Sequence, residues 1–353
     1  MKHIIIPIIV FILASCSKEQ PAASGMSEIH LQTTIENDKG APVKAVISGN
    51  RFGVGNTLGI FVYHSEKDEN DNRRPINNFA SYGERYKNVR AVYANMSTGW
   101  QYRFEGSGTN FEDVFLIEPP TTSSTTKEIT LLSYAPWIEG CTSISSIPFE
   151  IGGDSRNVKD MMWAEQNSTT ANSIEPDGRD KTVNLRFKHA LSLLKIGLKC
   201  KHNTSEMALT SITLRKNGSS GTILYNKGSL NAMDGSFNAF SKDDAAQTVT
   251  VDYTGEEYKF SQENPTTAPF MIFPVKYLND GDYILEFKFN GQELAAKYPI
   301  KRSDIMVAGD TAAEFRQGYS YTFNFTFNNY LQIDNVTINV SDNWTTQKHE
   351  LLF

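Results

Sequence analysis

The feature that most constrains the fold is a run near the C-terminus in which every second residue is aromatic. Tyr319, Tyr321, Phe323, Phe325 and Phe327 alternate with serine, threonine and asparagine. Successive side chains of a β-strand point to opposite faces, so this period of two places all the rings on one face. At about 3.3 Å per residue the strand would be about 30 Å long, enough to cross a sandwich sheet. We therefore expect residues 319–327 to form a core strand with a buried aromatic face.

Other segments have the same period and predict an all-β protein with few short helices. Ile29, Leu31, Thr33 and Ile35 alternate with polar residues in a half-buried strand. Residues 283–300 contain two alternating runs separated by Asn290-Gly291, a pair typical of a type I′ hairpin turn. Tyr, Phe and Thr are abundant and helical periodicity is scarce, which favours antiparallel sheets.

The N-terminus has the charge order and length of a secretory signal. Lys2 precedes an apolar run over residues 4–13, which is too short to span a bilayer. Ala14, Ser15 and Cys16 follow, and this order resembles the lipobox of bacterial lipoproteins, where the thiol is acylated and the peptide is cut before it. We expect residues 1–15 to be the signal peptide and residues 16–27 a flexible tether. The alternative is an ordinary signal with a chance cysteine.

Length indicates two domains. Removal of residues 1–15 from the chain of 353 leaves 338 residues, more than one hydrophobic core usually serves. Residues 167–179 have the polar composition of a connection. We place an N-terminal domain at residues 28–180 and a C-terminal domain at residues 181–353.

Charge and cysteine content limit the partners. The formal charge is −6, and it becomes −7 when Lys2 leaves with the signal, which argues against nucleic acid or an anionic membrane face. Once Cys16 is acylated, only Cys141 and Cys200 remain, so this is no disulfide framework. One bridge or two buried free thiols are both compatible with the sequence.

Motifs that carry chemistry are missing from the sequence. We find no Ser/His/Asp order with an elbow glycine, no HExxH, no phosphate loop and no Cys/His cluster. Asp68, Asn70 and Asn72 have the spacing of the start of a calcium loop, but the central glycine and terminal glutamate are missing, so a solvated loop is favoured. His189 has no ligand-spaced neighbour and is interpreted as a core histidine.

The adjacent carboxylate pairs do not indicate a catalytic site either. Glu112-Asp113 and Glu256-Glu257 stand in polar surroundings and are interpreted as solvated surface. We therefore expect no enzymatic activity, no cofactor and no metal.

Several short sequence motifs, taken in their order along the chain, carry a family resemblance that composition alone would not give. They are the lipobox, Leu58-Gly59-Ile60-Phe61-Val62, Phe187-x-His189-Ala190-x-Ser192, Gly318-x-x-Tyr321-x-Phe323 and a late Trp344. Together the chain resembles the fimbrillin (Mfa-like) family of Bacteroidetes pilus subunits. It departs from that pattern at Asn56-Thr57, where the family commonly has Gly-Asp.

The resemblance implies two transthyretin-like antiparallel β-sandwich domains and a lipoprotein precursor. It implies a structural subunit of cell-surface fimbriae that supports adhesion, with other fimbrial subunits as partners and the outer membrane reached through the lipid on Cys16. It also implies polymerisation by strand exchange after a trypsin-like protease removes the first strand.

Candidate residues for that exchange can be named. The removed strand would carry Ile29, Leu31 and Ile35, and the protease would cut after Lys44 or Arg51. Arg51 is preferred because glycines near it favour an accessible loop. The donor strand would be the C-terminal stretch whose apolar residues alternate: Leu331, Ile333, Val336, Ile338 and Val340.

The competing hypothesis is a surface glycan-binding lipoprotein. It would use exposed Trp100, Trp137 or Trp163 as stacking platforms for host or other glycans, whereas the simpler interpretation of each tryptophan is burial in the core. A hydrolase is a third and weaker hypothesis.

Overall fold

The computed structural model describes residues 26–35, 52–64, 82–95, 97–118, 128–155, 157–165, 172–203, 205–217, 223–238, 245–253, 258–275, 279–292, 295–307, 309 and 311–342. These residues form an all-β protein, as the alternation predicts. Helical structure is confined there to the 3-10 turn η2 (Glu84–Tyr86) and the short helix α1 (Arg302–Ile305). No helix within the described ranges is long and apolar enough to cross a membrane.

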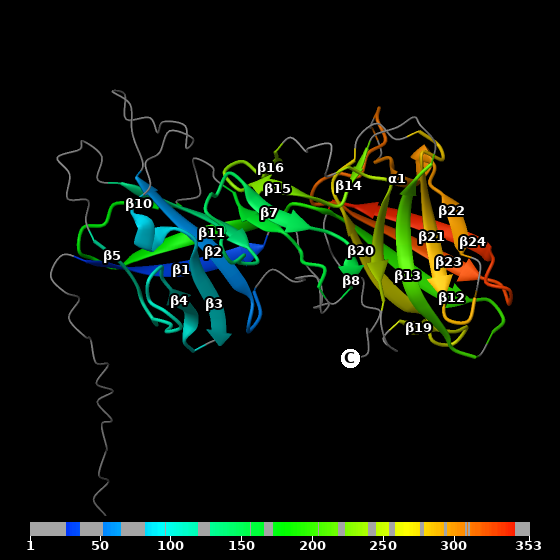
Figure 1. Ribbon diagram of the computed structural model, residues 1–353, viewed down its shortest axis with the longest axis horizontal. Coiled ribbons are helices and arrows are strands. Elements are labelled where there is room, and N and C mark those ends of the chain that lie inside the picture. Colours follow the sequence, from blue (N-terminus) through cyan, green and yellow to red (C-terminus); the bar gives the residue numbers. More distant parts are fainter. Residues whose placement is uncertain are drawn as a thin grey trace, which may run out of the picture.

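The N-terminal lobe is built on one large sheet with the order β4-β3-β2-β6-β9-β11-β1-β5, and β10 pairs β6 at its side. Its strands are β1 (Ser27–Ile35), β2 (Thr57–His64), β3 (Val89–Asn95), β4 (Gly99–Arg103), β5 (Phe115–Ile117), β6 (Ile129–Ala135), β9 (Met162–Ala164), β10 (Ser173–Ile174) and β11 (Lys181–His189). Figure 1 shows this lobe on the left, with β1 in dark blue and with β3 and β4 extending below it.

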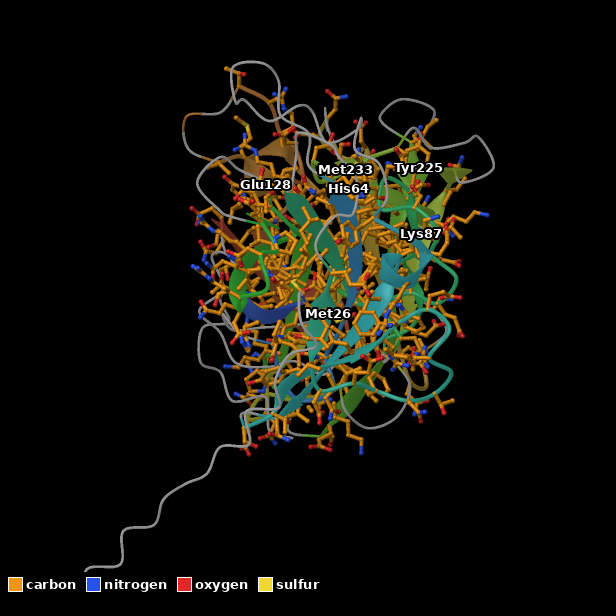
Figure 2. The ribbon with its side chains drawn as sticks, turned by 90° about the vertical axis from the view of Figure 1, so that its left-hand side faces the viewer. Met26, His64, Lys87, Glu128, Tyr225 and Met233 are labelled. Atoms are coloured by element: carbon orange, nitrogen blue, oxygen red, sulfur yellow. The ribbon has the colours of Figure 1, made fainter. Side chains whose placement is uncertain are left out.

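The sheet folds over so that its two ends meet. Tyr102 of β4 packs edge-on against Phe115 of β5, with ring centroids 5.1 Å apart, and Phe104 lies 5.2 Å from the same ring. The side chains between these layers form a core that includes Ile29, Leu58 and Phe187. Figure 2 looks along the molecule at this lobe and labels Met26, just before β1, and His64, the last residue of β2.

The C-terminal lobe is a sandwich of two sheets. One has the order β20-β12-β23-β24, and the other has the order β22-β21-β13-β18-β8, with β19 paired to β13. The strands are β8 (Gly153–Asp154), β12 (Ser192–Cys200), β13 (Met207–Lys216), β18 (Thr248–Asp252), β19 (Lys259–Phe260), β20 (Thr266–Ile272), β21 (Tyr283–Phe289), β22 (Ala296–Pro299), β23 (Ser320–Phe327) and β24 (Ile333–Ser341).

Two small sheets complete the described structure. β14 (Leu224–Tyr225) pairs β17 (Ala245–Ala246), and β15 (Lys227–Asn231) pairs both β7 (Ile147–Glu150) and β16 (Ser236–Phe237). In Figure 1 the sheet of β7, β15 and β16 lies between the two lobes.

The aromatic strand is confirmed as the centre of the C-terminal core. Tyr321, Phe323, Phe325 and Phe327 of β23 are each at most 1% exposed. The Phe325 ring lies 4.7 Å from Phe287 of β21 in the opposite sheet, so the aromatic face fills the space between the two layers. Tyr319 precedes the strand and is only partly buried.

Most strand pairs are antiparallel, but both lobes contain a parallel pair. β11 is antiparallel to β9 and parallel to β1, while β12 is antiparallel to β20 and parallel to β23. β11 and β12 follow each other in the chain. The place that β1 occupies beside β11 therefore corresponds to the place of β23 beside β12.

The sheets do not divide the chain at a single point. β11 begins at Lys181, after the expected boundary, and pairs with β1 and β9 of the N-terminal sheet. β7 and β8 precede that boundary, and they pair with β15 and β18 of the C-terminal half. The chain thus passes between the lobes more than once.

The hairpin of β21 and β22 is present, but its turn is not of type I′. The amide of Gln292 donates to the carbonyl of Phe289 at 3.2 Å, and Gly291 has φ +76°. A type I′ turn needs positive φ at both central residues. Among the described non-glycine residues only Asn88 and Leu331 have positive φ, so Asn290 does not meet that requirement.

Candidate functional site

The first described strand, β1, occupies an inner place in its sheet. β1 runs parallel to β11, from Ile29 opposite Lys181 to Ile35 opposite Phe187. On its other side it pairs antiparallel with β5, where Ile29 is opposite Phe115. A segment that precedes the rest of the domain thus supplies backbone hydrogen bonds to two neighbours.

The side chains of β1 behave as the alternation predicts. Ile29 and Ile35 are 2% and 3% exposed and belong to the N-terminal core, and Leu31 packs against that core while partly exposed. His30, Gln32 and Thr34 point away from it. If β1 were absent, an apolar groove would open beside β11, which would also have an unpaired edge.

The candidate cleavage residues Lys44 and Arg51 lie outside the described residues, as do Cys16, Asp68, Asn70, Asn72, Glu256-Glu257 and Trp344. The description resumes at Phe52, which is buried. Its ring lies 5.0 Å from Phe187 of β11 and 5.5 Å from Trp100 of β4. The chain is therefore anchored in the core directly after Arg51, and a cut there would leave this anchor with the domain.

The candidate donor strand is β24, which lies at the edge of its own sheet. It pairs antiparallel with β23, with Val336 opposite Phe325, Ile338 opposite Phe323 and Val340 opposite Tyr321. These apolar side chains are only partly buried, whereas Thr337 and Asn339 between them are exposed. β24 thus has one covered face and no partner strand on its outer side among the described residues.

The beginning of the donor stretch differs from a continuous alternation. Leu331 is buried, but it precedes the strand and its backbone has φ +56°. Ile333 pairs with Phe327, and a register shift separates this pair from the rest of the ladder. The regular period-two part is therefore Val336, Ile338 and Val340. β1 and β24 are nevertheless strands of equal length, with 9 residues each.

His189 is a core histidine, as the sequence indicates, and one of its ring nitrogens has a carboxylate partner. It is buried at the end of β11, and its Nδ1 lies 2.9 Å from Oδ2 of Asp160, which is also buried. The amide of Ala190 donates to the carbonyl of Met161 in the same region, at 2.7 Å. The Asp160 partner could not be predicted from the sequence, because it precedes His189 by 29 positions.

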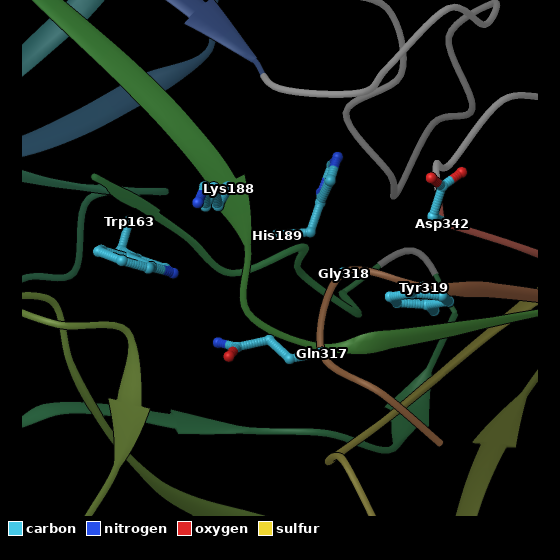
Figure 3. Close-up of a pocket in the computed structure, with 7 residues that line it drawn as sticks. All are labelled: Trp163, Lys188, His189, Gln317, Gly318, Tyr319 and Asp342. Atoms are coloured by element: carbon cyan, nitrogen blue, oxygen red, sulfur yellow. The ribbon is translucent and has the colours of Figure 1, made fainter. Parts of the chain in front are cut away.

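A cleft of about 380 Å³ opens beside His189, where β11 ends and β23 begins. Figure 3 shows its lining by Trp163, Lys188, His189, Gln317, Gly318, Tyr319 and Asp342. Lys188 Nζ forms an ion pair with Glu165 at 2.5 Å, and Gln317 Nε2 donates to the carbonyl of Gly235 at 2.8 Å. The Lys188 and Gln317 side chains that line the cleft thus bind neighbouring segments of the chain.

The tryptophans proposed as glycan platforms are mostly internal. Trp100 and Trp163 are 5% and 9% exposed, so they are core residues. Trp137 is partly exposed, and its Nε1 donates to the carbonyl of Asn88 at 3.1 Å. Only Trp137 among the three offers a ring near the surface.

Cys141 and Cys200 are two buried free thiols, which resolves the alternative that the sequence left open. Burial raises the pKa of both thiols. A raised pKa lowers the thiolate fraction, so neither cysteine is set up as a nucleophile.

One described group of side chains has the spacing of metal ligands. Glu28 and His30 of β1 and Asp180 before β11 each offer one ligand atom, and these atoms lie within 4.8 Å of one another. An imidazole and two carboxylates suit a divalent transition ion such as Zn²⁺. His30 and Asp180 are exposed, however, and exposed groups of this kind are common without an ion. The sequence could not reveal this group, because β1 and β11 are far apart along the chain.

Two of the motifs that carry the family resemblance meet in space. The amide of Gly318 donates to the carbonyl of Leu191 at 2.9 Å, and Ser192 Oγ donates to the carbonyl of Arg316 at 2.7 Å. Gly318 has φ +76°, a conformation that glycine adopts without strain. The phrase around His189 and the phrase before β23 thus form one junction.

The sequence comparison identifies a family. The profile of the fimbrillin-like family matches residues 44–344. The chain belongs to the fimbrillin-like family. Among curated proteins, none gives a significant match.

Solved structures with this fold come from Bacteroides species. A candidate cell adhesion protein from Bacteroides ovatus is 17% identical, with a TM-score of 0.54, over 92% of this chain and 100% of that one. Another from Bacteroides uniformis is 15% identical, with a TM-score of 0.51, over 91% of this chain and 98% of that one. At this identity the likeness shows that the fimbrillin-like chain shares their fold along nearly its whole length.

Proposed function

We propose that this fimbrillin-like chain is a structural subunit of cell-surface fimbriae that assembles by donor-strand exchange and supports adhesion. The observation that carries the proposal is the place of β1. It is an inner strand of the N-terminal sheet, yet it belongs to a segment that ends before the buried anchor Phe52. One backbone cut can therefore release the strand without removing any other described part of the lobe.

The exchange would proceed in two steps. A trypsin-like protease cuts after Arg51, or after Lys44, and the segment with Ile29, Leu31 and Ile35 leaves. The exposed edge of β11 then pairs with the β24 stretch of another subunit, whose Val336, Ile338 and Val340 fill the groove. The incoming strand replaces backbone hydrogen bonds and apolar contacts that the departing strand gave up, so assembly restores the N-terminal core.

Export would depend on the N-terminal segment. Signal cleavage before Cys16 and acylation of its thiol would tether the precursor to the outer membrane by residues 16–27. The partners are then the membrane, through the lipid, and other fimbrial subunits at the cell surface.

The N-terminal sequence of the protein on intact cells tests the proposal. Protein in shed fimbriae should begin at Phe52 or Ala45, whereas membrane-bound precursor should retain an acylated Cys16. A Cys16→Ala variant should lose lipid labelling and membrane fractionation. Surface protein whose N-terminus remains at residue 16, with no multimers, would contradict assembly by exchange, and unchanged fractionation of Cys16→Ala would contradict the anchor.

A further inference from the structure

Two arginines face each other on neighbouring strands of the N-terminal lobe. Arg90 of β3 is directly opposite Arg103 of β4 in the antiparallel register. Such pairs lie on the same face of a sheet with their Cβ atoms about 5 Å apart, and like charges in that position destabilise the sheet. Among the residues that the structure describes, no carboxylate forms an ion pair with either guanidinium.

Aromatic rings flank both guanidinium groups. The Arg90 Cζ lies 4.8 Å from the Trp137 ring and 5.7 Å from the Phe111 ring, and the corresponding distances for Arg103 are 5.2 Å and 5.9 Å. Phe111 is 38% exposed. Cation–π contact holds the two arginines in place, but it does not neutralise their charge.

The guanidinium of Arg90 is incompletely satisfied by the protein. Its Nε is buried and has no hydrogen-bond partner. Arg85 on the nearby turn η2 behaves differently, because its Nη2 lies 3.3 Å from both carboxylate oxygens of Glu112. Arg85 is thus paired with a carboxylate within the chain, whereas Arg90 and Arg103 have no such ion pair among the described residues.

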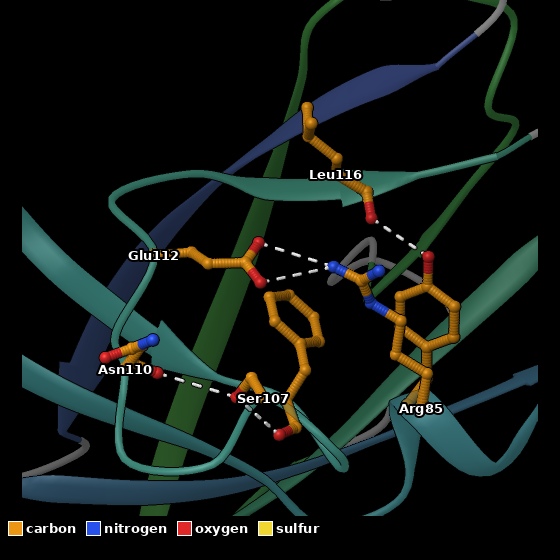
Figure 4. A network of polar contacts seen from close by, with 7 residues as sticks. Arg85, Ser107, Asn110, Glu112 and Leu116 are labelled. Atoms are coloured by element: carbon orange, nitrogen blue, oxygen red, sulfur yellow. Dashed lines mark hydrogen bonds and ion pairs between the residues drawn. The ribbon is translucent and has the colours of Figure 1, made fainter.

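The loop that presents Phe111 is fixed. Ser107 Oγ donates to the carbonyl of Phe104 at 2.7 Å, and the backbones of Tyr102 and Glu112 exchange hydrogen bonds of 2.8 and 2.7 Å. Figure 4 shows Arg85 reaching Glu112 across this loop, with Ser107 and Asn110 at its turn. A site on this surface would therefore be preorganised, which favours binding.

We propose that Arg90, Arg103, Trp137 and Phe111 form a binding site for an acidic polysaccharide. A guanidinium donates two parallel hydrogen bonds to a carboxylate or a sulfate, so an adjacent pair can hold one acidic sugar. The exposed ring of Phe111 would pack on the C–H groups of that sugar. In a chain of formal charge −6, this positive pair without an ion-pair partner among the described residues is a local exception that favours an anion.

A polysaccharide suits the site better than an added peptide strand does. β4 is the end strand of the sheet, but the backbone of Tyr102 already pairs with Glu112. Main-chain pairing with another protein is therefore blocked beside the two arginines. What remains is recognition by side chains, with charge in the centre and an aromatic ring at the rim.

The site is separate from strand exchange. None of the four residues of the site belongs to β1, β11 or β24, and Arg90 and Arg103 alternate with the buried residues through which β4 packs against β5. Assembled and unassembled subunits should therefore bind the polymer alike, so failure of one proposal does not decide the other.

Binding to polymers of known charge chemistry tests the inference. Titration of the mature full-length chain with a fluorescent heparin oligosaccharide and with an oligogalacturonate separates sulfate from carboxylate, and dextran provides a neutral control. Arg90→Gln and Arg103→Gln should each weaken binding of the preferred acidic polymer by about tenfold. Arg90→Lys should also weaken it, because lysine keeps the charge but loses the two-pronged donor.

Arg179→Gln is the matched control, since it removes one positive charge from an exposed position before β11. Melting temperature should be kept in all variants. The inference is overturned if neither acidic polymer binds, if dextran binds equally well, or if Arg179→Gln weakens binding as much as Arg90→Gln. Binding of an acidic peptide but of neither polymer would overturn it as well.

Discussion

Phe323 is the single residue at which the C-terminal core is most directly tested. Its side chain is buried, and its ring is stacked on that of Phe325 at 6.2 Å. Phe323→Ala should lower the free energy of unfolding by about 3–5 kcal/mol, because it removes a buried ring and leaves a cavity. Chemical denaturation measures this loss.

Thr322→Ala in the same strand is the control, since Thr322 points to the other face. It should change the free energy of unfolding by well under about 1 kcal/mol, as ordinary surface substitutions do. An equally small loss for Phe323→Ala would show that the aromatic face is not packed.

The buried hydroxyl of Tyr321 should make the protein less stable at alkaline pH. Its hydroxyl donates to the carbonyl of Glu314 and accepts from the amide of Arg316, each at 2.8 Å. Burial raises the pKa of Tyr321 from 10 to about 12. The contribution of the neutral Tyr321 to the free energy of unfolding is fully present below pH 10. It is lost as the pH rises from 10 to 12, because Tyr321 ionises at a lower pH in the unfolded chain than in the folded chain.

The free energy of unfolding should therefore fall by about 2 kcal/mol more in the parent chain than in Tyr321→Phe between pH 10 and pH 12. Urea titrations at several pH values measure the difference. The comparison with the variant matters, because burial also raises the pKa of Tyr82 to about 12. Parallel curves for the two chains would contradict the assignment to Tyr321.

The environment of a residue was predictable from the sequence where residues close to it in the chain determine it. The buried rings of β23 follow from a period of two, and the core position of His189 follows from the absence of ligand-spaced neighbours. The Asp160 partner, the Glu28, His30 and Asp180 group and the pair of Arg90 and Arg103 were not predictable. Each depends on tertiary packing, which brings together residues that are far apart in the chain or on different strands.

Among the elements, β24 carries the most specific prediction. In the cut protein, Ile338→Asp should prevent multimers, because a carboxylate would enter an apolar groove beside β11 without a partner. Asn339→Asp is the control on the exposed face of the same strand and should leave assembly intact. Size-exclusion chromatography after proteolysis measures both. Multimers of the Ile338→Asp variant would show that β24 is not the donor.

The strands were easier to predict than their pairing. β1, β21 and β23 appear within a few residues of the expected segments, because alternation and turn residues are local signals. The parallel pairs β1–β11 and β12–β23, and the crossing of β7 and β8 into the C-terminal half, are set by tertiary packing. The predicted type of the turn after β21 was wrong, because an Asn-Gly pair is compatible with more than one turn type.

At the scale of the whole molecule, the lobes are joined by packing as well as by the chain. Phe61 of β2 and Leu132 and Tyr134 of β6 belong to the same continuous cluster of buried residues as the C-terminal core. A chain that begins at Phe52 should therefore keep its C-terminal lobe while the N-terminal sheet has an open groove.

That truncated chain should bind the hydrophobic dye ANS more strongly than the full chain, because the groove exposes apolar surface. A synthetic peptide of residues 26–36 should reverse the increase, and the same peptide with Ile29→Asp and Ile35→Asp should not. Equal dye binding by the truncated and full chains would mean that the N-terminal lobe closes without β1.

Limited trypsin digestion followed by sizing tests assembly by strand exchange most directly. The account predicts cleavage after Arg51, loss of the segment that carries β1, and a ladder of multimers that grows with time. An Arg51→Gln chain, with Lys44→Gln added to block the second site, should stay uncut there and monomeric. A chain that is cut after Arg51 and remains monomeric, or one in which Arg51 is never cut, would contradict the account.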